Sequence, residues 1–176
     1  MCIICPNHES NWSVVLIQRT EDDSPHSGQL AFPGGAQDPE DLGDDLKTAR
    51  RECLEEVGVN IPSSAILGPL SPLYIPPSHF LVQPFVAWSR EPLEFHLQAE
   101  EVAAVHLLPL RSLPGPGEPW PIQRISLRHG VMKAPGWPCG DQMLWGATAM
   151  MVAELNMACQ MAGFGPSFAT TINNRI

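Results

Sequence analysis

Long hydrophobic runs are missing from this sequence of 176 residues. No apolar stretch approaches the roughly 18 to 20 residues that a transmembrane helix needs. The opening residues, MCIICPNHES, also lack the basic start of a signal peptide. The sequence therefore predicts no membrane partner and favours the cytoplasm.

Positive charge is scarce as well. The chain has 10 Lys and Arg against 19 Asp and Glu, which gives a formal net charge of −9. No basic cluster offsets this charge, so a phosphate backbone is repelled and nucleic acid is not an expected partner. An acidic protein that handles anionic ligands needs cations as intermediaries.

Cysteines are few and odd in number, five in all. They lack the dense, even spacing of a secreted disulfide scaffold, so we expect reduced thiols. Cys2 and Cys5 form a C-x-x-C motif with His8 close behind, but no second knuckle supplies a fourth zinc ligand. A structural zinc site is therefore disfavoured.

Proline, by contrast, is plentiful, and its 19 residues limit where helices can form. Apolar residues at helical spacing predict an amphipathic helix over about 45–57, capped by Asp44 or Asp45 and followed by Gly58. A second helix, apolar on more than one side, is predicted between Asp141 and Gly163.

Four shorter runs have the composition of β-strands, at 13–19, 79–88, 101–110 and 125–133. Strands and helices alternate irregularly, without an internal repeat. The predicted fold is therefore a mixed α/β (α+β) domain over 1–176, with one mixed sheet and helices packed on its faces.

Three carboxylates on the first predicted helix, Glu52, Glu55 and Glu56, fall on one helical face beside Arg51. Like charges at this spacing repel one another and oppose the helix dipole, by about 0.2 to 0.5 kcal/mol for each pair. A Glu-rich surface exposed to water is the simpler explanation. A divalent cation would instead gather these hard oxygen ligands, which suit Mg²⁺ or Mn²⁺ better than zinc.

A glycine turn, FPGG at 32–35, precedes this helix. Pro33 fixes φ, and Gly34 and Gly35 let the backbone turn tightly and approach a ligand or a metal with a carbonyl group. Together with the acidic loop DPEDLGDD and the segment RECLEEVGV, the turn forms a strand–loop–helix unit that brings oxygen ligands to a glycine loop.

This composite resembles the Nudix hydrolase box. Its second half is filled in register by the residues of RECLEEVGV, namely Arg51, Glu52, Cys53, Glu55, Glu56, Gly58 and Val59. The first half departs from the pattern, because Gly43 stands where the pattern has Glu and 15 residues separate Gly35 from Arg51. Asp41, Asp44 and Asp45 are the candidates to replace the missing acid.

The upstream segment 16–35 is similar to the extra signature of the coenzyme A pyrophosphatase branch of that family. The matching residues are Leu16, Arg19, Gly28, Phe32, Pro33, Gly34 and Gly35. Thr20 and Ser24 depart from it, and Ser24 replaces an Arg. The overall likeness covers roughly 13–160.

The resemblance implies an α/β/α sandwich and a metal-dependent enzyme that hydrolyses a nucleoside diphosphate linked to another group. It makes Glu52, Glu55 and Glu56 metal ligands, with the Gly35 carbonyl as a further one, and Arg51 an orienting residue. Glu101 is the expected additional ligand or general base, with an exposed acidic turn as the alternative. Arg19, Gly34 and Gly35 are the expected substrate contacts.

The expected substrate is coenzyme A or an acyl-coenzyme A, cut into 3′,5′-ADP and 4′-phosphopantetheine or its acyl form. The alternatives are another substrate, such as ADP-ribose, NADH or a dinucleoside polyphosphate, and a Nudix-fold binding or regulatory module without activity. His79 is a weaker candidate for substrate contact. The oligomeric state stays open, with a homodimer among the options.

Overall fold

A computed structural model describes residues 1–22, 26–76, 78–115, 117–127 and 130–163. Its centre is a six-stranded mixed sheet in which the order is β3-β2-β1-β7-β4 and β8 pairs with β2. β1 and β7 run parallel, and the other pairs run antiparallel. The strands are β1 Cys2–Pro6, β2 Trp12–Arg19, β3 Leu30–Ala31, β4 Ile66–Pro69, β7 Phe85–Trp88 and β8 Val102–Pro109.

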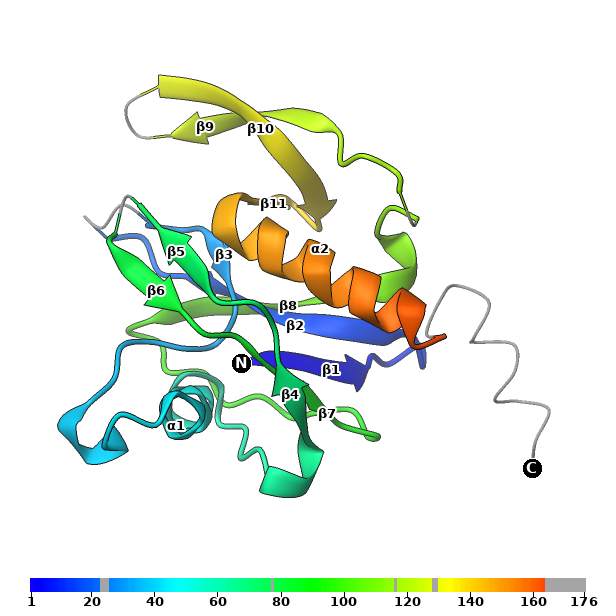
Figure 1. Ribbon diagram of the computed structural model, residues 1–176. Helices are drawn as coiled ribbons and strands as arrows, with labels where there is room; N and C mark the ends of the chain where they lie inside the picture. The colour runs from blue at the N-terminus through cyan, green and yellow to red at the C-terminus, as the bar shows by residue number, and fades with distance from the viewer. Residues whose placement is uncertain (23–25, 77, 116, 128–129, 164–176) are drawn as a thin grey trace.

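Two helices cover the two faces of this sheet (Figure 1). Alternate residues of β2 point to opposite faces, as strand geometry requires. Val15 and Ile17 pack in the core that includes α1 (Asp45–Val57), whereas Val14 and Leu16 pack in the core that includes α2 (Gly146–Met161). The expected α/β/α sandwich with a mixed sheet is confirmed.

Smaller elements surround the sandwich. A hairpin consists of β5 (Leu73–Ile75) and β6 (Phe80–Val82). A three-stranded antiparallel sheet has the order β11-β10-β9, built from β9 Ile122–Leu127, β10 Gly130–Cys139 and β11 Gln142–Trp145. Short 3-10 turns are η1 Pro39–Asp41, η2 Ser63–Ala65 and η3 Leu110–Ser112.

The first predicted helix is confirmed over the expected range, 45–57. Of the two candidate caps, Asp44 is the N-cap, because its carboxylate accepts hydrogen bonds from the backbone amides of Leu46 and Lys47. Gly58 ends the helix in the left-handed conformation, with φ 71°. Both ends of the helix are thus fixed by the residues that its sequence indicates.

The start of the second helix was predicted wrongly. Asp141 does not begin it, since residues 142–145 form β11 and pair with residues 136–139 of β10. The helix begins at Gly146 and ends at Met161. Cross-strand pairing therefore overrides the apolar helical pattern over the first residues of the predicted range.

Two predicted strands are divided. Gln83 and Pro84 separate β6 from β7 within the range 79–88. The range 125–133 spans the end of β9 and the start of β10, and residues 128–129 between them lie outside the described part of the chain.

β1 was missed entirely, although it lies in the middle of the sheet. Cys2 and Cys5 belong to it and are fully buried in the cores on opposite faces. Their thiols therefore point away from each other, which argues against a zinc site shared between them. Within the described residues, no helix is long and apolar enough to cross a membrane.

Candidate active site

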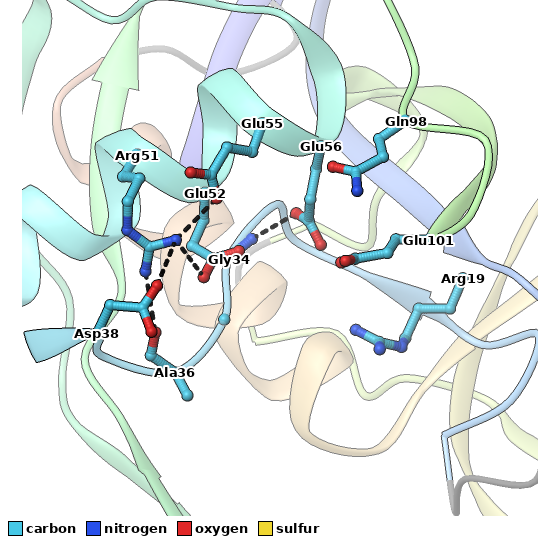
Figure 2. Close-up of a pocket in the computed structure, with 11 residues that line it drawn as sticks. Arg19, Gly34, Ala36, Asp38, Arg51, Glu52, Glu55, Glu56, Gln98 and Glu101 are labelled. Atoms are coloured by element: carbon cyan, nitrogen blue, oxygen red, sulfur yellow. Dashed lines mark hydrogen bonds and ion pairs between the residues drawn. The ribbon is translucent and has the colours of Figure 1, made fainter.

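Arg51 is the centre of a network of ion pairs at the exposed edge of α1. Its guanidinium nitrogens lie 2.7 Å from a carboxylate oxygen of Glu55 and 3.0 Å from one of Glu52. The same group donates to the carbonyl of Ala36 at 3.1 Å, in the loop that follows the glycine turn (Figure 2). Arg51 therefore joins the acidic face of the helix to that loop.

Of the three acids that are candidates to replace the missing Glu, Asp41 is the one that contacts Arg51. It is fully buried and accepts hydrogen bonds from Arg51 Nη2 at 3.0 Å and from the hydroxyl of Thr48 at 2.9 Å. The Arg51 guanidinium holds the pKa of Asp41 well below its usual range. The other two candidates are engaged elsewhere, since Asp44 caps α1 and Asp45 accepts from the side chain of Gln37.

Glu56 is the most buried of the three helical carboxylates, with 2% of its surface exposed. Its Oε2 accepts a hydrogen bond of 2.8 Å from the backbone amide of Gly34. Burial raises the pKa of Glu56 to about 7, and the Gly34 amide opposes this shift by stabilising the charged form. The glycine turn is thus fastened directly to the acidic helix.

Glu52 lies against Gly35 so closely that no side chain fits between them. A β-carbon built on Gly35 would come within 2.5 Å of Glu52 Oε1. Burial raises the pKa of Glu52, and the neighbouring Arg51 lowers it. A larger residue at position 35 would therefore force the Glu52 carboxylate or the turn to shift.

Two residues outside the helix complete the pocket from the sheet. Arg19 is the last residue of β2, and Glu101 directly precedes β8. Figure 2 shows their side chains entering the same space as Glu56, opposite the glycine turn. A cationic side chain thus faces a cluster of carboxylates.

The predicted metal ligands, the orienting Arg51 and the expected substrate contacts all line one open cavity of about 320 Å³. Its walls are formed by Arg19, Gly34, Gly35, Ala36, Asp38, Arg51, Glu52, Glu55, Glu56, Gln98 and Glu101. Within the described part of the chain, no three His, Cys, Asp or Glu residues are gathered closely enough to hold a metal ion as they stand. The carboxylates lie around the cavity and are held by protein groups.

Sequence reasoning missed Gln98 and Asp38. Gln98 enters the pocket because its backbone amide donates to the Glu56 carbonyl at 3.0 Å, a contact between distant segments that leaves no local sequence signal. Asp38 lies 3.5 Å from Arg51 and was recognised only as part of an acidic loop.

His79 does not line the pocket; it is exposed, and its ring Nδ1 lies 2.9 Å from the hydroxyl of Tyr74. Ser24 falls outside the described residues.

Comparison with known proteins defines the family of this chain. A family model described as NUDIX domain matches residues 1–127. The chain is 35% identical over 145 residues to a protein of Yersinia enterocolitica called "Uncharacterized Nudix hydrolase NudL", which covers 81% of this chain and 72% of that protein. A protein of the same name from Pectobacterium atrosepticum is also 35% identical, with 81% and 73% covered. The chain therefore belongs to the Nudix family and is a hydrolase of phosphoric anhydride bonds.

A solved structure supports the same fold. The MutT/nudix family protein from Enterococcus faecalis superposes with a TM-score of 0.62 and 21% identity. The match covers 91% of this chain, which spans only 60% of the Enterococcus chain. The family expected from the acidic helix is confirmed, whereas its coenzyme A branch stays a prediction.

Proposed function

We propose that this protein hydrolyses coenzyme A or acyl-coenzyme A in a reaction that depends on Mg²⁺ or Mn²⁺. The observation that carries the proposal is a pocket in which Glu52, Glu55 and Glu56 meet the glycine turn and Arg19. Nudix hydrolases act on nucleotide derivatives with the aid of divalent metals, and this pocket offers both a set of oxygen donors and a cation.

The donor set suits a hard divalent cation. Glu52, Glu55, Glu56, Glu101 and the carbonyl of Gly35 offer only oxygen atoms, which Mg²⁺ and Mn²⁺ prefer. The raised pKa of Glu56 also favours a bound cation, because the protein does not fully compensate the buried negative charge at this position. When bound, the metal would neutralise phosphate oxygens and lower the pKa of a coordinated water.

The protein groups have separate tasks in this proposal. Arg51 orients Glu52 and Glu55 through its ion pairs, and Asp41 fixes Arg51 from the buried side. Arg19 lies across the pocket and could donate two hydrogen bonds to a phosphate group. Glu101, on the same side, serves as an additional metal ligand or as the general base that takes a proton from water.

The reaction is a displacement at phosphorus. The oxygen of water forms a bond to one phosphorus of the diphosphate, and the bridging P–O bond breaks. One product is 3′,5′-ADP and the other is 4′-phosphopantetheine, or its acyl form when a thioester is the substrate. The phosphate that is attacked carries the oxygen from water, the other phosphate keeps the former bridging oxygen, and the protons of the water pass to the general base and to solvent.

Support for coenzyme A comes from the segment that leads into the site. Arg19, Gly34 and Gly35 match the coenzyme A signature and line the pocket. Ser24, which replaces an Arg of that signature, favours a second candidate, the hydrolysis of another nucleoside diphosphate derivative such as ADP-ribose.

A product assay with the purified protein separates these two candidates. Coenzyme A, acetyl-coenzyme A, NADH, ADP-ribose and diadenosine tetraphosphate are incubated with Mg²⁺, with Mn²⁺ or with excess EDTA, and products are identified by mass. We expect 3′,5′-ADP from coenzyme A with either metal and none with EDTA. Turnover of ADP-ribose without turnover of coenzyme A would overturn the proposed substrate, and turnover in EDTA would overturn the metal requirement.

A further inference from the structure

The peptide that carries Glu101 is held by Thr20, the residue that follows β2. The backbone amide of Thr20 donates to the carbonyl of Glu101 at 3.0 Å. Its hydroxyl donates to the carbonyl of Glu100, also at 3.0 Å. Thr20 therefore makes two hydrogen bonds to consecutive peptides, although 80 residues separate Thr20 from Glu100.

The same peptide is held from the side of α1. The carbonyl of Gln98 accepts from the amide of Glu101 at 3.0 Å, and the amide of Gln98 donates to the carbonyl of Glu56. The backbone of Glu101 is thus fixed through its amide and its carbonyl, while its side chain is exposed toward the pocket. Within the described residues, the hydrogen bonds found for Glu101 all involve its backbone.

An irregularity in the sheet lies at the same place. Gln18 pairs with Ala104 but Arg19 pairs with Val102, so the register of β2 and β8 skips Ala103. The skipped residue reverses the alternation of β8, and Val102 joins Val105 in the core on the α1 side. In a regular ladder, Glu101 would be displaced by about one residue, or 3.3 Å.

We infer that Thr20 is a positioning residue for Glu101. Its hydroxyl and amide hold the Glu100–Glu101 peptides at the bulge, so that Arg19 and Glu101 enter the pocket from adjacent strand ends (Figure 2). The inference rests on the role that the proposed function gives to Glu101. It also gives a task to Thr20, which stands where the signature has Ser or Ala.

A double-mutant cycle tests the inference. Thr20→Val removes the hydroxyl and keeps the shape of the side chain, Thr20→Ser keeps the hydroxyl, and both are combined with Glu101→Gln. We expect Thr20→Val to lower kcat about 3- to 10-fold with little change in KM, as loss of one hydrogen bond suggests. Thr20→Ser should restore kcat, and Thr20→Val should cost nothing further when Glu101 is already Gln.

Backbone hydrogen exchange supplies a second readout that needs no activity. The amides of residues 98–102 should exchange faster in Thr20→Val than in wild type, and at the wild-type rate in Thr20→Ser. Unchanged exchange in Thr20→Val, or independent losses of kcat in the double variant, would overturn the inference. If Glu101→Gln alone keeps the wild-type kcat, the proposed role of Glu101 fails, and faster exchange then still shows that Thr20 holds the peptide.

Discussion

The two helices that cover the sheet differ sharply in chemistry. α1 has seven charged residues among 13, whereas α2 has one, Glu154, among 16. α1 is capped by a side chain at its start, and α2 has no such cap. The carboxylates of α1 line the pocket, and the proposed function therefore assigns the chemistry to the α1 face of the sheet.

Substitution of the carboxylates on the two helices is the first test of this difference between α1 and α2. Glu55→Gln and Glu56→Gln should each lower turnover by about 10²- to 10³-fold, because each removes a proposed ligand of the metal that would neutralise the reacting phosphates. Glu154→Gln on α2 is the matched control. Its carboxylate accepts from the amide and hydroxyl of Ser71, away from the pocket, so kcat should be unchanged.

Steady-state kinetics with circular dichroism at equal protein concentration checks this prediction. The helical signal should match wild type in all three variants. Near-normal rates in both α1 variants would remove the assignment of this face to catalysis.

Gly35→Ala should produce the next largest effect. The new β-carbon would lie 2.5 Å from Glu52 Oε1, so the carboxylate or the turn must shift. Misplacement of the Glu52 carboxylate by about 1 Å should lower kcat/KM on the order of 10²-fold. Gly115→Ala is the control, since its β-carbon would meet only the exposed side chain of Glu118. Equal kcat/KM values in the two variants would contradict the close approach at Gly35.

Gly43 and Gly58 flank α1 and allow a matched test of stability. Both have positive φ, 79° and 71°, so Ala at either position is strained, by about 1 kcal/mol or more. Only at Gly58 would the β-carbon also clash, lying 2.7 Å from Cβ of His96. Thermal denaturation should therefore show the larger fall in Tm for Gly58→Ala. Equal falls would mean that His96 does not pack against the end of α1.

Asp41 gives the smallest and most pH-dependent effect. Because its pKa is lowered in the folded state, its contribution to stability is complete above its unfolded pKa, about 4. That contribution is lost as the pH falls below 4 toward the folded value. Asp41→Asn should therefore lower Tm at pH 7. The difference in Tm between this variant and wild type should be smaller at pH 3. A difference in Tm between Asp41→Asn and wild type that stays constant from pH 7 to pH 3 would contradict the buried ion pair.

Local signals predicted α1 and its surroundings well, because the information lies within the segment. Helical spacing, an acidic N-cap and Gly58 define the helix, and the same spacing places Glu52, Glu55 and Glu56 on one face. The choice of Asp41 over Asp44 and Asp45 could not be made, since it depends on how the inserted loop folds back to bury one carboxylate beside Arg51.

Features set by pairing between distant segments are harder to predict from the sequence. β1 lies in the centre of the sheet, yet its short apolar sequence gives no period that separates it from a disordered start. Residues 142–145 have the apolar pattern of a helix in the sequence, and they form a strand because they pair with β10. Gln98 reaches the pocket because the backbone of its segment pairs with distant residues, among them Glu56, and no sequence pattern reports this pairing.

Binding of Mn²⁺, followed by electron paramagnetic resonance of the free ion, tests the central claim most directly. Wild-type protein and Glu154→Gln should bind the ion with the same affinity, whereas combined Glu55→Gln and Glu56→Gln substitutions should weaken binding by at least about tenfold. Equal affinity in all three proteins would show that the acidic face of α1 is not where the metal binds.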